Sequence, residues 1–263
     1  MSGTDTDTAP HDWGSAPEFF GPRHEYRESL LRRQLLPVLP GGRILNAGCG
    51  GGSMTLDLLT RGYEVTSVDA SPAFVAHVAS QIAAKLPHLR PAPIVEVGDL
   101  HDLRFADAAF DAVVCGEVLE HLSDDASAAR ELARVLAPGG VLVASVPANP
   151  HRYDWVDRWA GHERRYTVDG LGRLLAVAGF CDVEVTSWGF PLTGLYHRWV
   201  YRSLLRRRLE RGGDAVTPAS PGGATGRLAH RAVRAALEVD TLFLGRVPGW
   251  FGLIARARTP QAA

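Results

Sequence analysis

The sequence predicts an α/β fold in which short buried strands alternate with helices. Apolar runs of strand length, bounded by glycine and proline, recur along the chain, and stretches with helical spacing of apolar residues lie between them. Four glycines also crowd into positions 48–52, directly after the first apolar run. With 263 residues the chain can form one large α/β domain with additions, or two small domains.

The stretch Arg43–Ser53 contains the first strand and a sharp turn into a helix. Ile44 and Leu45 follow a Pro-Gly-Gly break, so they begin a short buried strand, and Met54–Arg61 continues as the helix. Glycine tolerates the positive φ of such a turn, and its missing Cβ lets a ligand approach the backbone. The first free N–H groups of the helix point back at the turn. This combination predicts a nucleotide site.

The spacing of the glycines indicates which nucleotide. A dinucleotide fingerprint needs a third glycine five residues after Gly48, where this chain has Ser53, and a P-loop needs a lysine that is missing here. The pattern G-x-G-x-G resembles motif I of the class I S-adenosylmethionine-dependent methyltransferases. That resemblance implies cofactor contacts from Asn46, Gly48, Cys49, Gly50 and Gly52. The family usually has an acid in place of Asn46, so the charge that would pair with the cofactor's ammonium is missing there.

Two later acids extend the predicted cofactor site. The second strand, Tyr63–Val68, ends in Asp69, which lies 21 residues after Gly48, close to the spacing expected of a carboxylate that accepts both ribose hydroxyls. Ala70 follows, and Ser71-Pro72 caps a helix that runs to about Leu86.

The third strand, Pro91–Val97, precedes Gly98, Asp99 and Leu100. The resemblance implies that Asp99 binds the adenine amino group and that Leu100 packs near the ring, while the alternative is that Asp99 only caps the following turn. The fourth strand, Phe110–Cys115, adds Cys115 to the expected cofactor residues.

The stretch that follows the fourth strand carries the candidate catalytic residue. The sequence Glu-Val-Leu-Glu-His is similar to the motif at this place in the ubiquinone-biosynthesis-type O-methyltransferases. Glu117 and His121 are four apart, so a helix would place them on one face. His121 has an ordinary pKa that suits a base near neutral pH, and it could take a proton from the acceptor. The alternative is a histidine that only forms a hydrogen bond across the turn.

The region after the fifth strand is the predicted acceptor site. A helix over Asp124–Leu136 ends at a Pro-Gly-Gly break, and Val141–Val146 is the fifth strand. The loop beyond it is dense in aromatic and titratable side chains, which line small-molecule pockets. With Glu117, the candidates for binding the acceptor are Asn149, His151, Tyr153, Trp155, His162, Arg165 and Tyr166. The competing interpretation is an exposed loop pinned by its tryptophans. No metal-ligand spacing is visible, so we expect no metal.

The N-terminal region is predicted as a flexible tail over residues 1–17, followed by a helix over Glu18–Leu36. In related methyltransferases a helix placed here folds over the cofactor, which implies that Arg23, Tyr26 and Arg27 reach the cofactor's carboxylate. A solvated amphipathic helix is the alternative.

The C-terminal part combines regular elements with an insertion. Thr167–Gly179 is predicted as a helix capped at both ends, Cys181–Trp188 as the sixth strand and Trp250–Arg258 as the seventh. The family joins these strands by a hairpin, whereas here residues 191–248 intervene. They contain a predicted helix over Leu195–Arg211, a linker over Gly212–Gly226 and a helix over Arg227–Leu244.

The first inserted helix is rich in arginine and carries Trp and Leu. Arg198, Arg202 and Arg206 are four apart and form a stripe. Such a helix can lie on an anionic membrane surface as a peripheral contact, bind an anionic acceptor or pack against a partner subunit. The alternative is an ordinary helix whose arginines are solvated.

Composition excludes several classes of protein. The net charge of −1 gives no general reason to expect nucleic acid. Three widely spaced cysteines fit neither a disulfide scaffold nor a zinc cluster and indicate a reducing cytoplasm. Residues 1–10 are polar, unlike a signal peptide, and no apolar run is long enough to span a membrane.

The resemblance implies a doubly wound, seven-stranded, mostly parallel sheet of order 3-2-1-4-5-7-6, with the last strand antiparallel. Residues 18–263 would form a single methyltransferase domain with the insertion. The expected activity is methyl transfer from S-adenosyl-L-methionine to a small molecule. Oxygen is the expected acceptor atom, and nitrogen and carbon are the alternatives. An NAD(P)-dependent reductase and a non-catalytic binding protein of the same fold remain alternatives. The sequence does not specify the acceptor or the oligomeric state.

Overall fold

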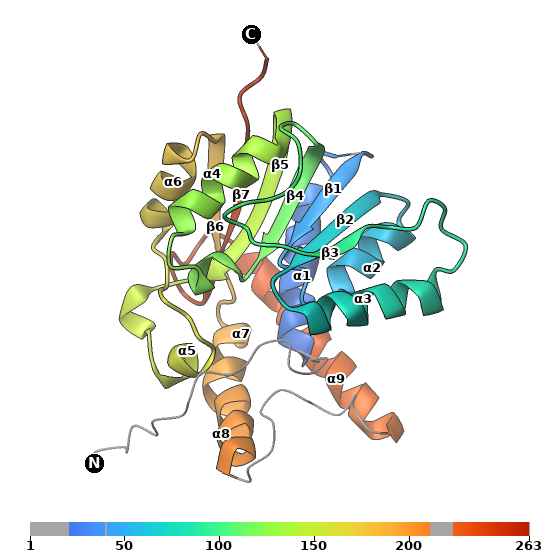
Figure 1. The fold of residues 1–263 in the computed structure, drawn as a ribbon. Coiled ribbons are helices and arrows are strands. Elements are labelled where there is room, and N and C mark those ends of the chain that lie inside the picture. The colour runs from blue at the N-terminus through green and yellow to red at the C-terminus, as the bar shows by residue number, and fades with distance from the viewer. Residues whose placement is uncertain (1–20, 40, 211–222, 263) are drawn as a thin grey trace.

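The computed structural model describes residues 21–39, 41–210 and 223–262, and the predicted tail over residues 1–17 lies outside them. Seven strands form one sheet of order β3-β2-β1-β4-β5-β7-β6 (Figure 1). Neighbouring strands are parallel except that β7 runs antiparallel to β5 and β6. The predicted fold is confirmed. The strands are β1 (Arg43–Ala47), β2 (Glu64–Asp69), β3 (Val95–Val97), β4 (Phe110–Gly116), β5 (Leu136–Pro147), β6 (Cys181–Trp188) and β7 (Gly252–Arg258).

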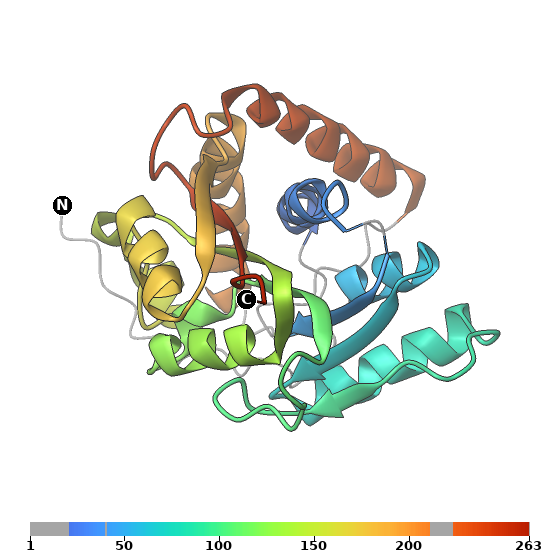
Figure 2. The ribbon, with the colours of Figure 1, turned by 90° about the horizontal axis from the view of Figure 1, so that it is seen from above.

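Helices cover both faces of the sheet (Figure 2). Helices α4 and α6 pack on one face, and α1, α2 and α3 pack on the other, with α9 lying against α1. The α-helices are α1 (Gly21–Leu35), α2 (Ser53–Thr60), α3 (Pro72–Lys85), α4 (Asp125–Val135), α5 (Trp155–Trp159), α6 (Val168–Val177), α7 (Leu192–Leu195), α8 (Arg202–Glu210) and α9 (Gly223–Leu237). Shorter or wider helical turns are η1 (Leu119–His121), η2 (Pro150–Arg152), η3 (Tyr196–Tyr201) and η4 (Glu238–Phe243).

The alternation of side chains along the central strands explains why the sheet needs cover on both sides. In β4, Ala112 and Val114 belong to the core beneath α1, α2 and α3, whereas Val113 and Cys115 belong to the core beneath α4 and α6. Successive strand residues point to opposite faces, so a strand that is apolar throughout is buried on both. Cys115 therefore lies in the core beneath α4 and α6, and the cofactor contact expected of it stays a prediction.

Helix ends lie where capping residues were expected. The Ser71 hydroxyl accepts a hydrogen bond from the Phe74 N–H at the start of α3, and the Thr167 hydroxyl accepts one from the Gly170 N–H at the start of α6. Gly179 follows the end of α6 with φ of 102°.

Two strands differ in length from the prediction. Strand β3 has three residues, because the prolines at 91 and 93 cannot donate hydrogen bonds to a ladder. Strand β5 begins at Leu136, opposite Phe110, so the Pro-Gly-Gly segment lies within the strand and not before it.

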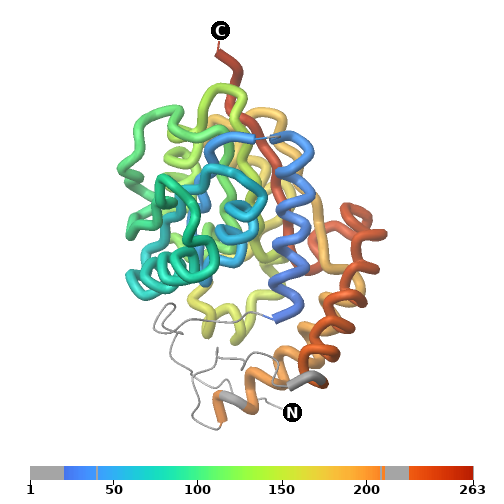
Figure 3. Tube along the Cα trace, turned by 90° about the vertical axis from the view of Figure 1, so that its right-hand side faces the viewer, coloured from blue at the N-terminus to red at the C-terminus, as the bar shows by residue number. Residues whose placement is uncertain are grey.

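The insertion consists of two helical arms that extend from the same end of the sheet (Figures 1 and 3). The first is continuous from Leu192 to Glu210 and contains one π-helical segment, η3. The second begins at Gly223, so residues 223–226 are helical and not linker, while the rest of the predicted linker lies outside the described residues.

The predicted arginine stripe does not form one free surface. Arg202 forms an ion pair with Asp154, and the guanidinium groups of Arg202 and Arg206 both lie over the ring of Trp155. These two arginines therefore attach the first arm to α5, while Arg198 lies over its neighbour Trp199. Sequence spacing placed the arginines on one stripe but could not show that α5 covers part of it.

We expect Gly52→Ala to destabilise the fold more than Gly62→Ala. Both glycines have left-handed backbones, with φ of 79° and 87°, so each alanine costs about 1–2 kcal/mol of strain. A Cβ on Gly52 would also lie 2.6 Å from Val78 Cγ2, whereas one on Gly62 would meet nothing within 4 Å. Denaturant unfolding of both variants measures the difference, and equal losses would contradict the close packing of α2 on α3.

Candidate active site

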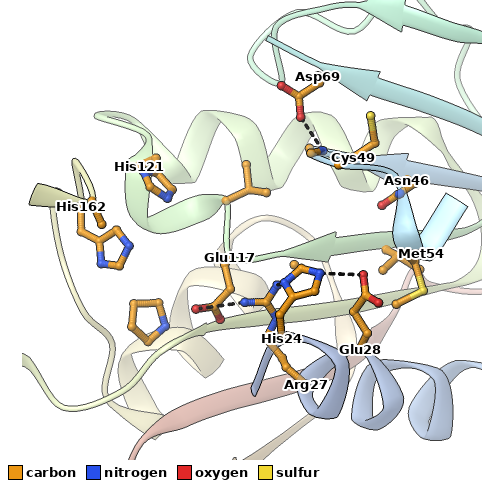
Figure 4. Close-up of a pocket in the computed structure, with 18 of the residues that line it drawn as sticks. His24, Arg27, Glu28, Asn46, Cys49, Met54, Asp69, Glu117, His121 and His162 are labelled. Carbon is orange, nitrogen blue, oxygen red and sulfur yellow. Dashed lines mark hydrogen bonds and ion pairs between the residues drawn. The ribbon is translucent and has the colours of Figure 1, made fainter. Parts of the chain in front are cut away.

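A cavity of about 770 Å³ opens along the edge of the sheet where the parallel strands end (Figure 4). Open α/β sheets bind ligands at this edge. Because β7 is antiparallel, it contributes its first residue. Each strand lends one or more side chains or backbone groups to the wall, among them Asn46, Asp69, Val97, Gly116, Pro147, Trp188 and Gly252.

The glycine turn forms one wall of the cavity. Gly48 and Gly50 have φ of 75° and 49°, and the N–H groups of Gly48 and Cys49 donate to the Val68 carbonyl at 2.8 and 3.0 Å. A Cβ on Gly50 would meet nothing within 4 Å, so the backbone here is open to a ligand. Gly52 lies outside the lining, where it forms the N-cap of α2.

Asp69 is held against this turn. Its carboxylate accepts hydrogen bonds from the Gly50 N–H at 2.8 Å and from the Ser71 N–H at 2.9 Å. Burial raises the pKa of Asp69, and the two backbone hydrogen bonds oppose the shift. Asp69 and Ala70 both line the cavity, as the sequence predicted.

Asn46 is oriented by a buried chain of polar groups. Its amide nitrogen donates to the Thr55 hydroxyl at 2.9 Å, and this hydroxyl lies 2.8 Å from the Ser67 hydroxyl. Asn46 lines the cavity as an uncharged amide where an acid is usual in the resembled family.

Asp99 caps a turn and lines the cavity at the same time. Its Oδ1 accepts from the His101 N–H at 2.9 Å and lies 2.6 Å from His101 Nδ1. The backbone hydrogen bond, followed by the side-chain one, lowers the pKa of Asp99. Leu100 is buried beside it and also lines the cavity. The two interpretations of Asp99 are therefore compatible.

Helix α1 covers the cavity and carries a network of charged side chains (Figure 4). Arg27 donates to His24 Nδ1 at 2.9 Å and lies 3.6 Å from Glu117, while His24 Nε2 lies 3.0 Å from Glu28 Oε1. The Ser53 hydroxyl donates to the same Glu28 oxygen at 2.5 Å, which ties α1 to the glycine turn.

Glu28 is ionised although it is buried. Burial alone would raise its pKa, but His24, Ser53 and Arg27 outweigh burial and lower the pKa to about 2. Glu28 and His24 were not among the site residues predicted from the sequence, although their i, i+4 spacing beside Arg27 gave a signal.

Arg23 and Tyr26, which the sequence placed together at the cofactor, diverge. Arg23 lines the cavity, where its guanidinium lies 4.5 Å from the centre of the Tyr201 ring and 2.8 Å from His197 Nδ1. Tyr26 is fully buried against Trp188 and is not part of the lining, so its contact with the cofactor stays a prediction. His197 and Tyr201 come from the insertion, which the sequence could not assign to the site.

Glu117 and His121 do not share a helix. Glu117 has φ of 58°, a left-handed conformation that ends strand β4, and only Leu119–His121 form a helical turn. Both side chains nevertheless line the cavity. Burial, followed by the charge of His162, lowers the pKa of His121 to about 4, so its imidazole is neutral at pH 7.

A cluster of three titratable side chains lies at this wall: His121 and His162 line the cavity, and Glu120 is buried behind the lining. The potential ligand atoms of Glu120, His121 and His162 all lie within 4.8 Å of one another, and the two imidazole rings are edge to face. Glu120 is fully buried, and neither of its carboxylate oxygens has a hydrogen-bond partner among the described residues. Burial, and then Glu117, raise its pKa well above the ordinary value. The cluster can hold a metal ion, a property that local sequence spacing did not reveal because His162 is remote.

His162 is oriented from behind by Asp157. Asp157 Oδ1 lies 2.9 Å from His162 Nδ1 and accepts from Arg165 Nε at 2.7 Å. Burial alone would raise the pKa of Asp157, but the hydrogen bonds from His162 and Arg165 lower it to about 2. His162 and Arg165 line the cavity as predicted, and Asp157 lines it too.

The other five loop residues predicted to bind the acceptor do not line the cavity, although Val156, Trp159 and Ala160 of the same loop do. The Tyr166 hydroxyl donates to Asp125 and the Tyr153 hydroxyl to the His162 carbonyl, both at 2.7 Å. Asn149 accepts from the N–H of His151, and Trp155 packs beneath the first arm. These five residues, Asn149, His151, Tyr153, Trp155 and Tyr166, lie outside the cavity lining, and the acceptor contact expected of them stays a prediction. They order the loop, which matches the alternative interpretation.

Comparison with known proteins shows which proteins the chain is similar to. Residues 45–144 match the family model described as a methyltransferase domain. A probable S-adenosylmethionine-dependent methyltransferase of Mycobacterium tuberculosis is 34% identical over 177 residues, which are 65% of this chain and 58% of that protein. The chain therefore contains a methyltransferase domain over residues 45–144 and is similar to S-adenosylmethionine-dependent methyltransferases. The ubiquinone biosynthesis O-methyltransferase of Alkalilimnicola ehrlichii is 36% identical over 153 residues, or 56% of this chain and 60% of the relative.

Solved structures share the fold of this chain. The Haemonchus contortus phosphoethanolamine N-methyltransferase 2 matches with a TM-score of 0.64 at 16% identity, covering 95% of this chain and 56% of that one. The [4+2]-cyclase SpnF matches with a TM-score of 0.61 at 23% identity, covering 89% and 80%. The chain spans about 58–60% of the length of the curated relatives named above. Within the described ranges, no helix is both long enough and apolar enough to cross a membrane.

We expect Asp157→Asn to destabilise the protein by about 3–5 kcal/mol at pH 7, because the variant leaves the Arg165 charge without its buried partner. The pKa of Asp157 is lowered from an ordinary 3.8 to about 2, so its stabilisation is complete above about pH 4 and disappears as the pH falls through about 2. Unfolding measured from pH 7 to pH 2 should show the two proteins converging. The exposed Asp182→Asn is the control and should change stability by less than about 0.5 kcal/mol.

Proposed function

We propose that the chain transfers a methyl group from S-adenosyl-L-methionine to the hydroxyl group of a small molecule. The observation that carries this proposal is the glycine turn with Asp69 bound to it, at the edge of a cavity with charged groups on the facing helix α1. The volume of about 770 Å³ lies in the range typical of small-molecule sites. The names of the relatives support the activity and the acceptor class.

The cofactor's groups find complementary side chains around the cavity. Asp69 would accept the ribose hydroxyls, and Asp99 would accept from the adenine amino group beside Leu100. Arg23 and Arg27 offer positive charge for the carboxylate. Asn46 has no negative charge to pair with the cofactor's ammonium. Glu28, which stays ionised beside Ser53, would supply that charge.

The cofactor's sulfonium makes its methyl group reactive, so the chain's main tasks are to align the acceptor and to exclude water. Helix α1 covers the cavity together with two residues of the insertion, His197 and Tyr201. His121 is neutral at pH 7 and can accept the proton that the acceptor hydroxyl loses.

A metal-assisted reaction is the second candidate, favoured by the buried, unpartnered carboxylate of Glu120. With His121 and His162, this carboxylate would hold a divalent cation that lowers the pKa of an acceptor hydroxyl. Asp157 would then orient His162 as the outer partner of a metal ligand.

Two further alternatives from the sequence are weaker. An NAD(P)-dependent reductase would need a third glycine where the chain has Ser53. A protein that binds the cofactor without transferring its methyl group is compatible with the fold, because the same fold serves a cyclase. Turnover of S-adenosylmethionine with a panel of hydroxylated metabolites separates these alternatives.

We expect Asp69→Ala to weaken binding of S-adenosylhomocysteine by about ten- to a hundredfold, because charged hydrogen bonds to two hydroxyls are lost. Asp69→Asn, which keeps an acceptor for the turn, separates the ribose contact from folding of the turn. Isothermal titration calorimetry measures both, with Asp182→Ala as a distant control. Unchanged affinity in both Asp69 variants contradicts the ribose assignment.

We expect His121→Ala to lower turnover by about 100-fold or more, as is typical for loss of a general base. With a pKa of about 4, the wild-type imidazole is unprotonated and available as a base above that pH. The rate should therefore be flat from pH 6 to pH 9 and fall below about pH 5. Turnover after treatment with EDTA decides between the two candidates. Full activity supports the imidazole acting without a metal. Activity that EDTA removes and that Mg²⁺ or Mn²⁺ restores in the wild type, but not in Glu120→Gln, supports the metal.

A further inference from the structure

The insertion concentrates positive charge that the rest of the chain does not have. Residues 191–248 contain ten arginines and four acidic residues, although the whole chain has a net charge of −1. Among its described residues, Glu210 is the one exposed acid. The exposed arginines are Arg198, Arg206, Arg207, Arg227, Arg231 and Arg246. The two arms therefore form a basic end on a molecule that is otherwise acidic.

The second arm also exposes an apolar stripe. Its exposed residues Leu228, Ala232, Ala235, Val239 and Leu242 follow one another at intervals of four, three, four and three. This spacing keeps side chains on one face of a helix. Leu228 and Leu242 are 69% and 66% exposed, whereas Leu237, between them in sequence, is buried against the core beneath α1. The stripe therefore faces away from the body of the protein.

The first arm exposes a second stripe. Leu195, Trp199 and Leu204 are spaced by four and five residues, and Trp199 and Leu204 are 66% and 56% exposed. The π-helical segment Tyr196–Tyr201 accommodates the longer interval, because a π-turn has more residues than an α-turn. On the inner side of the same arm, His197 and Tyr201 line the cavity.

We propose that the two arms bind the surface of an anionic phospholipid bilayer. A helix with exposed Leu and Trp on one face and arginine beside it lies in the interface between water and lipid. Each basic residue near an anionic surface adds attraction, and tryptophan prefers this depth. Figures 1 and 3 show both arms at one end of the molecule, where they can reach one surface.

A second copy of the chain fits these stripes less well. The described residues of the insertion include six exposed arginines and one exposed acid, so two copies meeting through this end would place like charges together. An anionic surface complements this charge. The proposal is independent of methyl transfer, because binding to vesicles is measured without cofactor or acceptor.

The test is sedimentation of the full chain with sucrose-loaded vesicles of phosphatidylglycerol and phosphatidylcholine, compared with vesicles of phosphatidylcholine alone. We expect binding to the anionic vesicles that weakens at least tenfold between about 0.1 M and 0.5 M salt, since screening shortens the reach of surface charge. Wild-type protein that remains in the supernatant with anionic vesicles at low salt overturns the proposal.

Two sets of variants locate the surface. Arg207→Glu, Arg227→Glu and Arg231→Glu together should weaken binding at least tenfold. The same charge change at Lys85, Arg130 and Arg173, all exposed outside the insertion, is the matched control and should retain most of the binding. Equal losses in both sets mean that only net charge matters and overturn the assignment to the arms.

The apolar contribution is tested by changing Trp199, Leu228 and Leu242 to glutamine. We expect at least tenfold weaker binding, with an unchanged circular dichroism spectrum and unchanged affinity for S-adenosylhomocysteine as evidence of folding. Light scattering gives the remaining outcome. A wild-type dimer that the glutamine variant converts to a monomer assigns the stripes to a second copy of the chain and overturns the membrane proposal.

Discussion

The carboxylate of Asp69 accepts hydrogen bonds from the backbone of Gly50 and of Ser71, and the geometry of the site depends on this junction. It joins the end of β2 to the turn after β1 and to the start of α3, so three elements share one side chain. The Val68 carbonyl, which accepts from Gly48 and Cys49, fixes the same turn from the neighbouring residue. A change in the turn therefore displaces the acid, and loss of the acid loosens the turn. Rigid support of this kind lets a site keep its geometry before a ligand arrives.

Much of the fold was predictable, because its signals are local. Glycine and proline mark the turns, capping residues mark the starts of α3 and α6, and apolar runs mark the strands. The residues of the cofactor half lie at strand ends, where a parallel sheet brings them to one edge. Asn46, Asp69 and Asp99 could therefore be placed together without knowledge of their contacts. The strand order came from resemblance, since periodicity does not report which strands are neighbours.

The part of the cavity wall formed by the loop after β5 and by the insertion was less predictable, because its contacts join distant parts of the chain. His162 meets His121 through a loop, and Arg23 meets His197 across more than 170 residues. Composition marked the loop as a pocket, yet Tyr153 and Tyr166 use their hydroxyl groups to hold the loop itself. Aromatic and titratable residues serve both purposes, and only tertiary contacts distinguish them. The left-handed backbone at Glu117 likewise interrupted a helix that spacing alone had favoured.

The insertion leaves the sheet at the end of β6 and returns at the start of β7, two strands that pair with each other. Its entry and exit are thus fixed side by side, and its length makes no demand on the register of the sheet. A change in the length of such a segment leaves the pairing of the strands and the glycine turn intact. Because His197 and Tyr201 on its inner side line the cavity, such a change would reshape the cavity wall. The position of the insertion makes the chain adaptable at one defined place.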